Sequence, residues 1–159
     1  MVATPIGLST RYIPEGTVKF YWVVSIATYT SPTRAELNAG TDLSPQIAAM
    51  GDWDVTATPI AAPDLVSTFV SQIAGTVAAN NTTLDMYADQ ATSDARTLMP
   101  RNSTGYIVKF MGGDVTGRKM DVFPVTVAAA AKATTLTTPV VISFTYVATR
   151  IPAEDVAVP

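Results

Sequence analysis

Apolar and polar residues alternate along residues 17–29, and this alternation predicts the first strand of the chain. The even positions from 18 to 26 are all apolar (Val18, Phe20, Trp22, Val24 and Ile26), whereas the odd positions mix polar and apolar side chains. A period of two residues is typical of a strand that lays one face on a core. The predicted strand has 13 residues (17–29), which is long for a small domain.

A second pattern covers residues 106–127, with the sequence YIVKFMGGDVTGRKMDVFPVTV. It predicts two apolar strands joined by a turn that contains Gly112, Gly113 and Gly117. Glycine permits the positive φ angles that tight hairpin turns require. Residues 140–149 alternate in the same way and predict the last strand.

The middle of the chain is expected to contain three shorter strands, at residues 53–58, 65–73 and 82–88. Pro59 and Pro63 predict a loop between the first two. Residues 65–73 also fit helical spacing, which is the alternative, but their β-branched and aromatic residues favour a strand. The alanine-rich residues 128–133 are interpreted as a strand end followed by a loop.

Two short helices are expected. Thr33 and Glu36 form a capping-box pattern, and Gly40 is suited to ending that helix. A second helix is predicted over residues 89–98, before Pro100.

These elements predict a mainly β fold, an antiparallel β-sandwich or partial barrel with one or two short α-helices, because no helix of crossover length separates the strands. The length of 159 residues fits a single domain. Prolines near both ends predict extended arms at about residues 1–16 and 150–159.

The composition of the chain is poor in charged residues. Hydrophobic residues make up 48% of the chain and charged residues only 14%. A monomer coated with serine and threonine is one explanation, but burial of large surfaces between subunits is favoured, since soluble monomers usually carry more charge. The net charge of −3 argues against a protein that holds nucleic acid by its phosphates.

The absence of histidine and cysteine removes Ser-His and Cys-His catalysis and thiolate metal sites. Carboxylate groups are the remaining candidates. Asp52 and Asp54 could act as an acid and base or hold a metal ion, and Asp85, Asp89 and Asp94 could gather near an ion. Solvated residues at strand ends and turns are the favoured interpretation of both groups. The glycines before Arg118-Lys119 lack phosphate-loop spacing. We therefore predict no enzymatic activity, no cofactor and no metal.

Two stretches, together with the closing strand VVISFTYVATRIPAED, resemble the major tail tube proteins of long-tailed bacteriophages. They are PTRAELNAGTDLSPQI at residues 32–47 and residues 98–127, with LMPRNSTGYIVKF at its start. The resemblance extends over most of the chain and rests on the order of these segments, since none is a catalytic motif.

The resemblance implies a tail-tube fold, with six subunits in a ring and rings stacked into a tube. The implied partners are further copies of the chain, a tape-measure protein in the lumen, tail terminator and distal tail proteins, and passing double-stranded DNA without specific binding. It also implies a virion protein made in the host bacterial cytoplasm, without contact to a membrane. The alternatives are the inner tube of a contractile tail or injection machine, and a non-enzymatic β-sandwich that decorates a virion or binds a receptor.

On this basis, the candidate lumen-wall and assembly residues are Lys19, Tyr21, Ser25, Ile107, Lys109, Lys119, Asp121, Ser143 and Thr145. The resemblance implies an acidic lumen, yet three of these residues are lysines. Either some of the lysines lie at ring contacts or the strand register differs by one residue, which would exchange the two faces.

Overall fold

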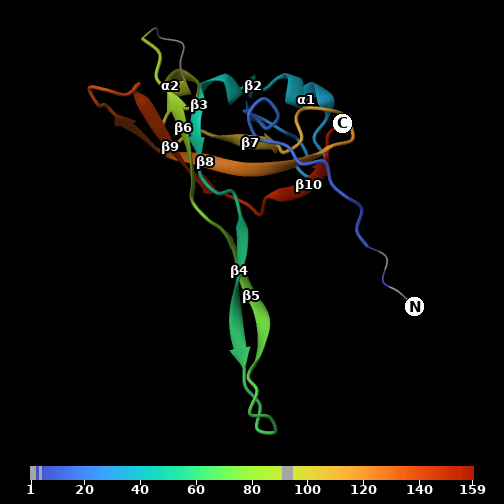
Figure 1. Cartoon of the computed structure of the whole chain (residues 1–159). Helices are drawn as coiled ribbons and strands as arrows, with labels where there is room; N and C mark the ends of the chain where they lie inside the picture. The colour runs from blue at the N-terminus through green and yellow to red at the C-terminus, as the bar shows by residue number, and fades with distance from the viewer. Residues whose placement is uncertain (1–2, 4, 91–94) are drawn as a thin grey trace.

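The computed structural model describes residues 3, 5–90 and 95–159, and it consists of a β-rich body from which a two-stranded ribbon projects (Figure 1). The main sheet is antiparallel, with strand order β2-β1-β7-β8-β9-β6-β3, and β10 pairs with β8. Its strands are β1 (Lys19–Val23), β2 (Thr41–Asp42), β3 (Ile47–Met50), β6 (Thr82–Tyr87), β7 (Thr104–Phe110), β8 (Lys119–Ala133), β9 (Val141–Ala148) and β10 (Ala153–Ala157). The ribbon is β4 (Val55–Ala62) paired with β5 (Ser71–Ala79).

Helical structure is limited to α1 (Arg34–Asn38), α2 (Ala95–Leu98) and the 3-10 turn η1 (Ser44–Gln46) among the described residues. The predicted fold class, mainly β and antiparallel with two short helices, is confirmed.

The main sheet carries a hydrophobic core on each face, which explains why consecutive residues of its strands are buried. In β8, Met120 and Val122 belong to one core, and Phe123 and Val125 to the other. The inner core contains Phe20, Trp22, Leu43, Leu84, Met86, Ala95, Met99, Ile107, Phe123, Val125, Val127, Ile142, Phe144 and Tyr146. The outer core contains Val23, Ile26, Leu37, Val108, Phe110, Met120, Val122, Ala153 and Val158.

The sheet curves into a partial barrel around the inner core. The strands at its two ends, β2 and β3, are connected only through Leu43 and η1, so the two ends of the sheet lie close together. β1 and β3 nevertheless do not pair with each other in the described structure, and a seam stays open between them.

The first strand is much shorter than predicted, since β1 ends at Val23. Val23 and Ile26 both pack into the outer core with Leu37, and this packing requires the chain to leave the sheet. The Ala27 N–H donates to the Glu36 carboxylate at 2.7 Å, which ties the turning chain to α1. Tertiary packing therefore overrides the period-two pattern beyond Val23.

The middle of the chain also differs from the prediction. Pro59 lies inside β4, where the β4–β5 register shifts between Ala57 and Pro59, a position that tolerates the missing N–H. The predicted strand over residues 65–73 is wrong, because residues 65–70 form the end of the ribbon and β5 begins at Ser71. Asp64 closes this turn by accepting hydrogen bonds from the N–H groups of Val66 and Ser67.

Other local predictions are confirmed. Thr33 and Glu36 form the capping box of α1. β7 and β8 form the predicted hairpin, with Gly113 and Gly117 at positive φ in its turn. β6 and β9 agree closely with their predicted ranges.

Three other regions differ from their predicted structure. Residues 128–133 continue β8 and are not a loop, because β9 pairs with them along their length. α2 occupies only the end of its predicted range, and residues 91–94 lie outside the described part of the chain. The range 150–159, predicted as an extended arm, contains β10, which pairs with β8.

Candidate assembly surfaces

The projecting ribbon is the first candidate surface. Figure 1 shows β4 and β5 extending away from the body as an isolated two-stranded structure. Asp64 is the only charged residue between Asp54 and Asp85 in the sequence. An isolated two-stranded hairpin is at best marginally stable in water, so the ribbon is suited to being covered by another surface.

Apolar side chains of the ribbon are open to solvent. Leu65 and Val66 at its end are almost fully exposed, and Phe69 is 76% exposed. Along the strands, Ile60, Ile73 and Val77 are each more than half exposed. Contiguous exposed apolar side chains mark interaction surfaces in soluble proteins.

The base of the ribbon is anchored by polar contacts. The Asn80 amide donates to both Asp54 carboxylate oxygens at 3.0 Å, and the Asn80 N–H donates to the Asp54 carbonyl oxygen. At Gly75, a Cβ atom would lie 2.4 Å from the Thr58 carbonyl oxygen, so the two strands approach too closely for a side chain there. The ribbon thus has a defined shape although few groups surround it.

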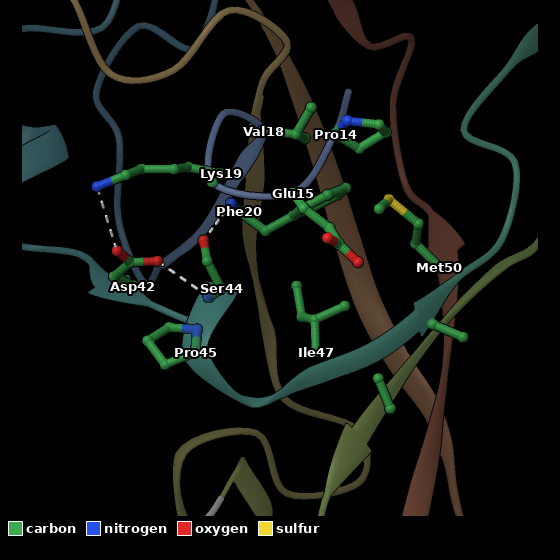
Figure 2. A pocket seen from close by; sticks show the side chains of 13 residues that line it. Pro14, Glu15, Val18, Lys19, Phe20, Asp42, Ser44, Pro45, Ile47 and Met50 are labelled. Carbon is green, nitrogen blue, oxygen red and sulfur yellow. Dashed lines mark hydrogen bonds and ion pairs between the residues drawn. The ribbon is translucent and has the colours of Figure 1, made fainter. Parts of the chain in front are cut away.

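A groove at the open seam of the sheet is the second candidate surface. It has a volume of about 610 Å³ and lies between residues 14–20 and residues 42–50. Figure 2 shows Val18, Ile47 and Met50 around the opening, with Glu15 extending into it. At one end, Lys19 pairs with Asp42 at 3.7 Å, and the Ser44 hydroxyl accepts a hydrogen bond from the Phe20 N–H.

The far end of the β8–β9 hairpin presents an unpaired strand edge. Residues 128–133 pair with β9 on one side, and the described structure places no strand on the other. The face of this hairpin opposite the inner core carries small side chains: Ala129 lies beside Thr145 and Ala131 beside Ser143. Asp85 is placed next to Ser143 on the same face, and one of its carboxylate oxygens is buried without a hydrogen-bond partner.

A polar cluster joins α1 to the β7–β8 turn. Arg34 forms a bidentate ion pair with the Asp114 carboxylate. The Tyr21 hydroxyl also donates a hydrogen bond to this carboxylate at 3.0 Å. The hydrogen bonds from Arg34 are the main cause of the lowered pKa of Asp114. Burial, followed by the hydrogen bond to Asp114, raises the pKa of Tyr21 to about 12. The cluster therefore stays in one charge state near neutral pH.

Among the described residues, the carboxylates considered as catalytic or metal-binding groups are not gathered into a metal site. Asp54 is engaged with Asn80, Asp52 is exposed, and neither lies within a strand. Asp94 lies outside the described residues. In the described part of the chain, no group of three acidic side chains could hold a metal ion. No helix in that part is long and apolar enough to cross a membrane.

A model of the phage tail tube protein family matches residues 8–159. The chain belongs to the phage tail tube protein family. Its fold is similar to that of a chain in the cryo-EM structure of the anti-feeding prophage (AFP) baseplate, 6-fold symmetrised, with a TM-score of 0.57 and 12% sequence identity. The similarity covers 95% of each chain and concerns the fold. No curated protein matches the sequence.

Membership of this family makes the chain a structural subunit of a phage tail and a component of the virion. The tail tube protein therefore needs surfaces for assembly with other tail proteins. The ribbon, the groove and the free edge of β8 have the properties of such surfaces.

The structure distributes the predicted wall residues of the tail tube protein over several places. Ser143 and Thr145 share the small-residue face of β9, and Ser25 is exposed in the bend after β1. Lys19 borders the groove, whereas Tyr21 packs edge-on against Phe110 beside the polar cluster.

The remaining predicted wall residues lie on β7 and β8. Ile107 is fully buried in the inner core. Lys109 is opposite Asp121 in the β7–β8 register. Lys119 and Asp121 contact β10, through the Asp155 carbonyl oxygen at 2.7 Å and the Asp155 N–H at 2.9 Å respectively. These nine residues thus do not occupy a single face.

Sequence reasoning missed both the ribbon and the groove as candidate surfaces. The sequence does carry a signal for the ribbon, because residues 55–84 contain a single charge but many apolar side chains. The groove has no such signal, since it arises where the two ends of the curved sheet fail to pair.

Proposed function

We propose that this chain forms the wall of a phage tail tube by assembling with copies of itself into stacked hexameric rings, which enclose a conduit for DNA delivery. Family membership supports the tail role. The observation that supports the proposed self-assembly is the apolar ribbon, which projects from the body and has almost no charged residues.

The ribbon is suited to reaching a neighbouring subunit. Burying exposed apolar side chains stabilises an interface by roughly 25 cal/mol for each Å² removed from water. Leu65, Val66 and Phe69 are concentrated at the ribbon end, which is the part farthest from its own body. Contact of this end with an adjacent ring would hold successive rings together.

The free edge of β8 supports lateral assembly within a ring. An unpaired edge exposes backbone N–H and C=O groups that can pair with a strand of another chain. Residues 128–133 offer such an edge, and closing sheets across subunits would satisfy it. The adjacent face with Ser143 and Thr145 is then a candidate lumen wall.

The remaining parts of the proposal concern partners and chemistry. The acidic balance of the chain, with a net charge of −3, disfavours retention of DNA by the wall. Production in the host cytoplasm, a tape-measure protein in the lumen, and tail terminator and distal tail proteins at the tube ends complete the proposed assembly. The proposed role is structural and involves no catalysis.

The fold likeness to a chain of the anti-feeding prophage baseplate supports a second candidate function, the inner tube of a contractile injection machine. The two candidates differ in whether a contractile sheath surrounds the tube. Electron microscopy of the virion that contains this protein separates them, because a tail without a sheath excludes the second candidate.

Electron microscopy of the purified protein tests self-assembly directly. We expect tubes or rings of constant diameter with sixfold symmetry in averaged end views. The double variant Val66→Asp/Phe69→Asp should remain folded, with an unchanged melting temperature, but should no longer form tubes. The matched variant Val66→Leu/Phe69→Leu keeps the apolar surface and should assemble. A wild-type protein that stays monomeric at all concentrations would contradict the proposal.

A further inference from the structure

We propose that residues 5–13 of one subunit bind in the groove between β1 and β3 of a second copy, as an added strand beside β3. This inference rests on the proposed self-assembly and assigns one of its contacts. It specifies which segment fills the open seam of the sheet.

The groove has the features of a strand-binding site. β3 pairs with β6 along one edge only, so its other edge is free to accept backbone hydrogen bonds in the described structure. The opening is lined largely by apolar groups, including Val18, Ile47 and Met50 (Figure 2). Three of the four residues of β3 are exposed, as expected for a strand that still lacks a neighbour.

Residues 5–13 have the matching properties. They have no regular secondary structure, and Ile6 and Leu8 are almost fully exposed. In an extended conformation Ile6, Leu8 and Tyr12 would lie on one side, facing the groove, because side chains alternate along a strand. Apart from Pro5, each residue of the segment has an N–H group available for pairing.

The geometry at the base of the segment favours a second copy over the same chain. Residues 14–17 form a turn, in which the Thr17 and Val18 N–H groups donate to the Pro14 carbonyl oxygen. Pro14 itself borders the groove, and the segment before it leads away from the body (Figure 1). Because the segment leads away from the body that carries the groove, it can reach the groove of a second copy, and such a head-to-tail contact can repeat from copy to copy.

Charge complementarity points to the same occupant. Lys19 and Asp42 at the groove neutralise each other, whereas Glu15 has no ion-pair partner among the described residues. Arg11 is the one charged residue of the segment, and it is exposed without an ion-pair partner in that part of the chain. A bound segment brings a single positive charge to a groove with one unpaired negative charge.

Disulfide trapping tests this contact, because the natural chain contains no cysteine. Chains carrying Leu8→Cys are mixed with chains carrying Met50→Cys, assembled and oxidised. We expect a covalent dimer of the two chains on a non-reducing gel. Chains with Leu136→Cys, at another fully exposed leucine, serve as the control and should give no dimer with Met50→Cys.

Three results would overturn the inference. The first is the absence of the dimer in assembled protein. The second is a disulfide between Met50→Cys and Val66→Cys at the ribbon end instead. The third is a disulfide within a single chain that carries both Leu8→Cys and Met50→Cys. Tubes that form while trapping fails leave the proposed function intact, whereas protein that never assembles contradicts the proposed function itself.

A charge exchange gives an independent readout, because Arg11 and Glu15 are both exposed. Arg11→Glu and Glu15→Arg should each reduce the yield of the trapped dimer several-fold. The double variant Arg11→Glu/Glu15→Arg should restore it. A double variant as weak as the two single variants would show that these residues do not meet.

Discussion

Trp22 lies in a tightly packed part of the inner core. It is 2% exposed in the inner core, and a Cβ at Gly105 would lie 2.6 Å from its ring, so the neighbouring strand has room for the indole only because residue 105 is glycine. We predict that Trp22→Asp prevents folding. Truncating a buried tryptophan costs about 3–5 kcal/mol, and burying an unpaired charge adds to this, against a total stability of about 5–15 kcal/mol.

Circular dichroism and solubility measure this outcome. Trp22→Phe is the control, because it keeps an aromatic ring and removes an indole N–H that has no hydrogen-bond partner in the structure. The control should fold with reduced stability. A soluble, folded Trp22→Asp monomer would refute the assignment of this face to the core.

The Asp114 carboxylate supports a prediction about pH. Its folded-state pKa is lowered, chiefly by the hydrogen bonds from Arg34, so its contribution to stability is fully present above the ordinary aspartate pKa. That contribution is lost as the pH falls through the lowered folded-state pKa. Asp114→Asn should therefore reduce the free energy of unfolding by about 1–2 kcal/mol at neutral pH.

Urea unfolding at a series of pH values checks the sign. The advantage of the wild type over Asp114→Asn should be constant down to about pH 4 and should shrink at lower pH. Asp52→Asn, at an exposed aspartate, is the matched control and should show a much smaller difference at every pH. An advantage of Asp114 that grows on acidification would contradict the assigned ion pair.

At the scale of elements, β4 and β5 pair only with each other in the described structure, so their mutual contacts decide the shape of the ribbon. We predict that Gly75→Ala deforms the ribbon, because the new Cβ would meet the Thr58 carbonyl oxygen at 2.4 Å. The body should keep its melting temperature, while tube formation falls sharply. Thr76→Ala on the same strand is the control and should assemble normally.

Thermal unfolding and electron microscopy of the two ribbon variants provide the measurement. Loss of the folded body in Gly75→Ala would show that the ribbon and the body fold as one unit. Normal tubes in that variant would show instead that the ribbon shape does not matter for assembly.

Elements whose signals are local could be predicted from the sequence. The capping box of α1 and the glycine turn between β7 and β8 depend on neighbouring residues, and both formed as expected. β1 could not be delimited, because its end at Val23 depends on packing against Leu37, fourteen positions away. The position of Pro59 within β4 could not be predicted, because an isolated ribbon tolerates a proline that a central strand would exclude.

The candidate surfaces were harder to predict than the strands. Assigning Ile107 and Lys109 to a face requires the knowledge that the main sheet has a core on both sides. The groove requires the knowledge that β1 and β3 do not pair. Neither fact can be inferred from the alternation of apolar and polar residues along a single strand, since both arise from the curvature of the whole sheet.

At the scale of the whole molecule, the shortage of charge determines how the proposed assembly responds to solvent. Only 14% of the residues are charged, and the ribbon end is apolar. At about 1 M salt the Debye length is roughly 3 Å, so exposed ion pairs such as that of Lys19 and Asp42 contribute little, whereas apolar contacts persist. We therefore predict that assembled tubes withstand high salt.

Cooling is the converse perturbation, because the stabilisation from apolar burial weakens as the temperature falls. The fraction of subunits in tubes, measured by sedimentation, should remain unchanged or rise between low and high sodium chloride and should decrease on cooling towards 0 °C. Val66→Leu/Phe69→Leu should behave like the wild type, since it keeps the apolar ribbon end. Tubes that dissolve in salt but tolerate cold would show that ion pairs hold the subunits together, and the ribbon would then not be their main contact.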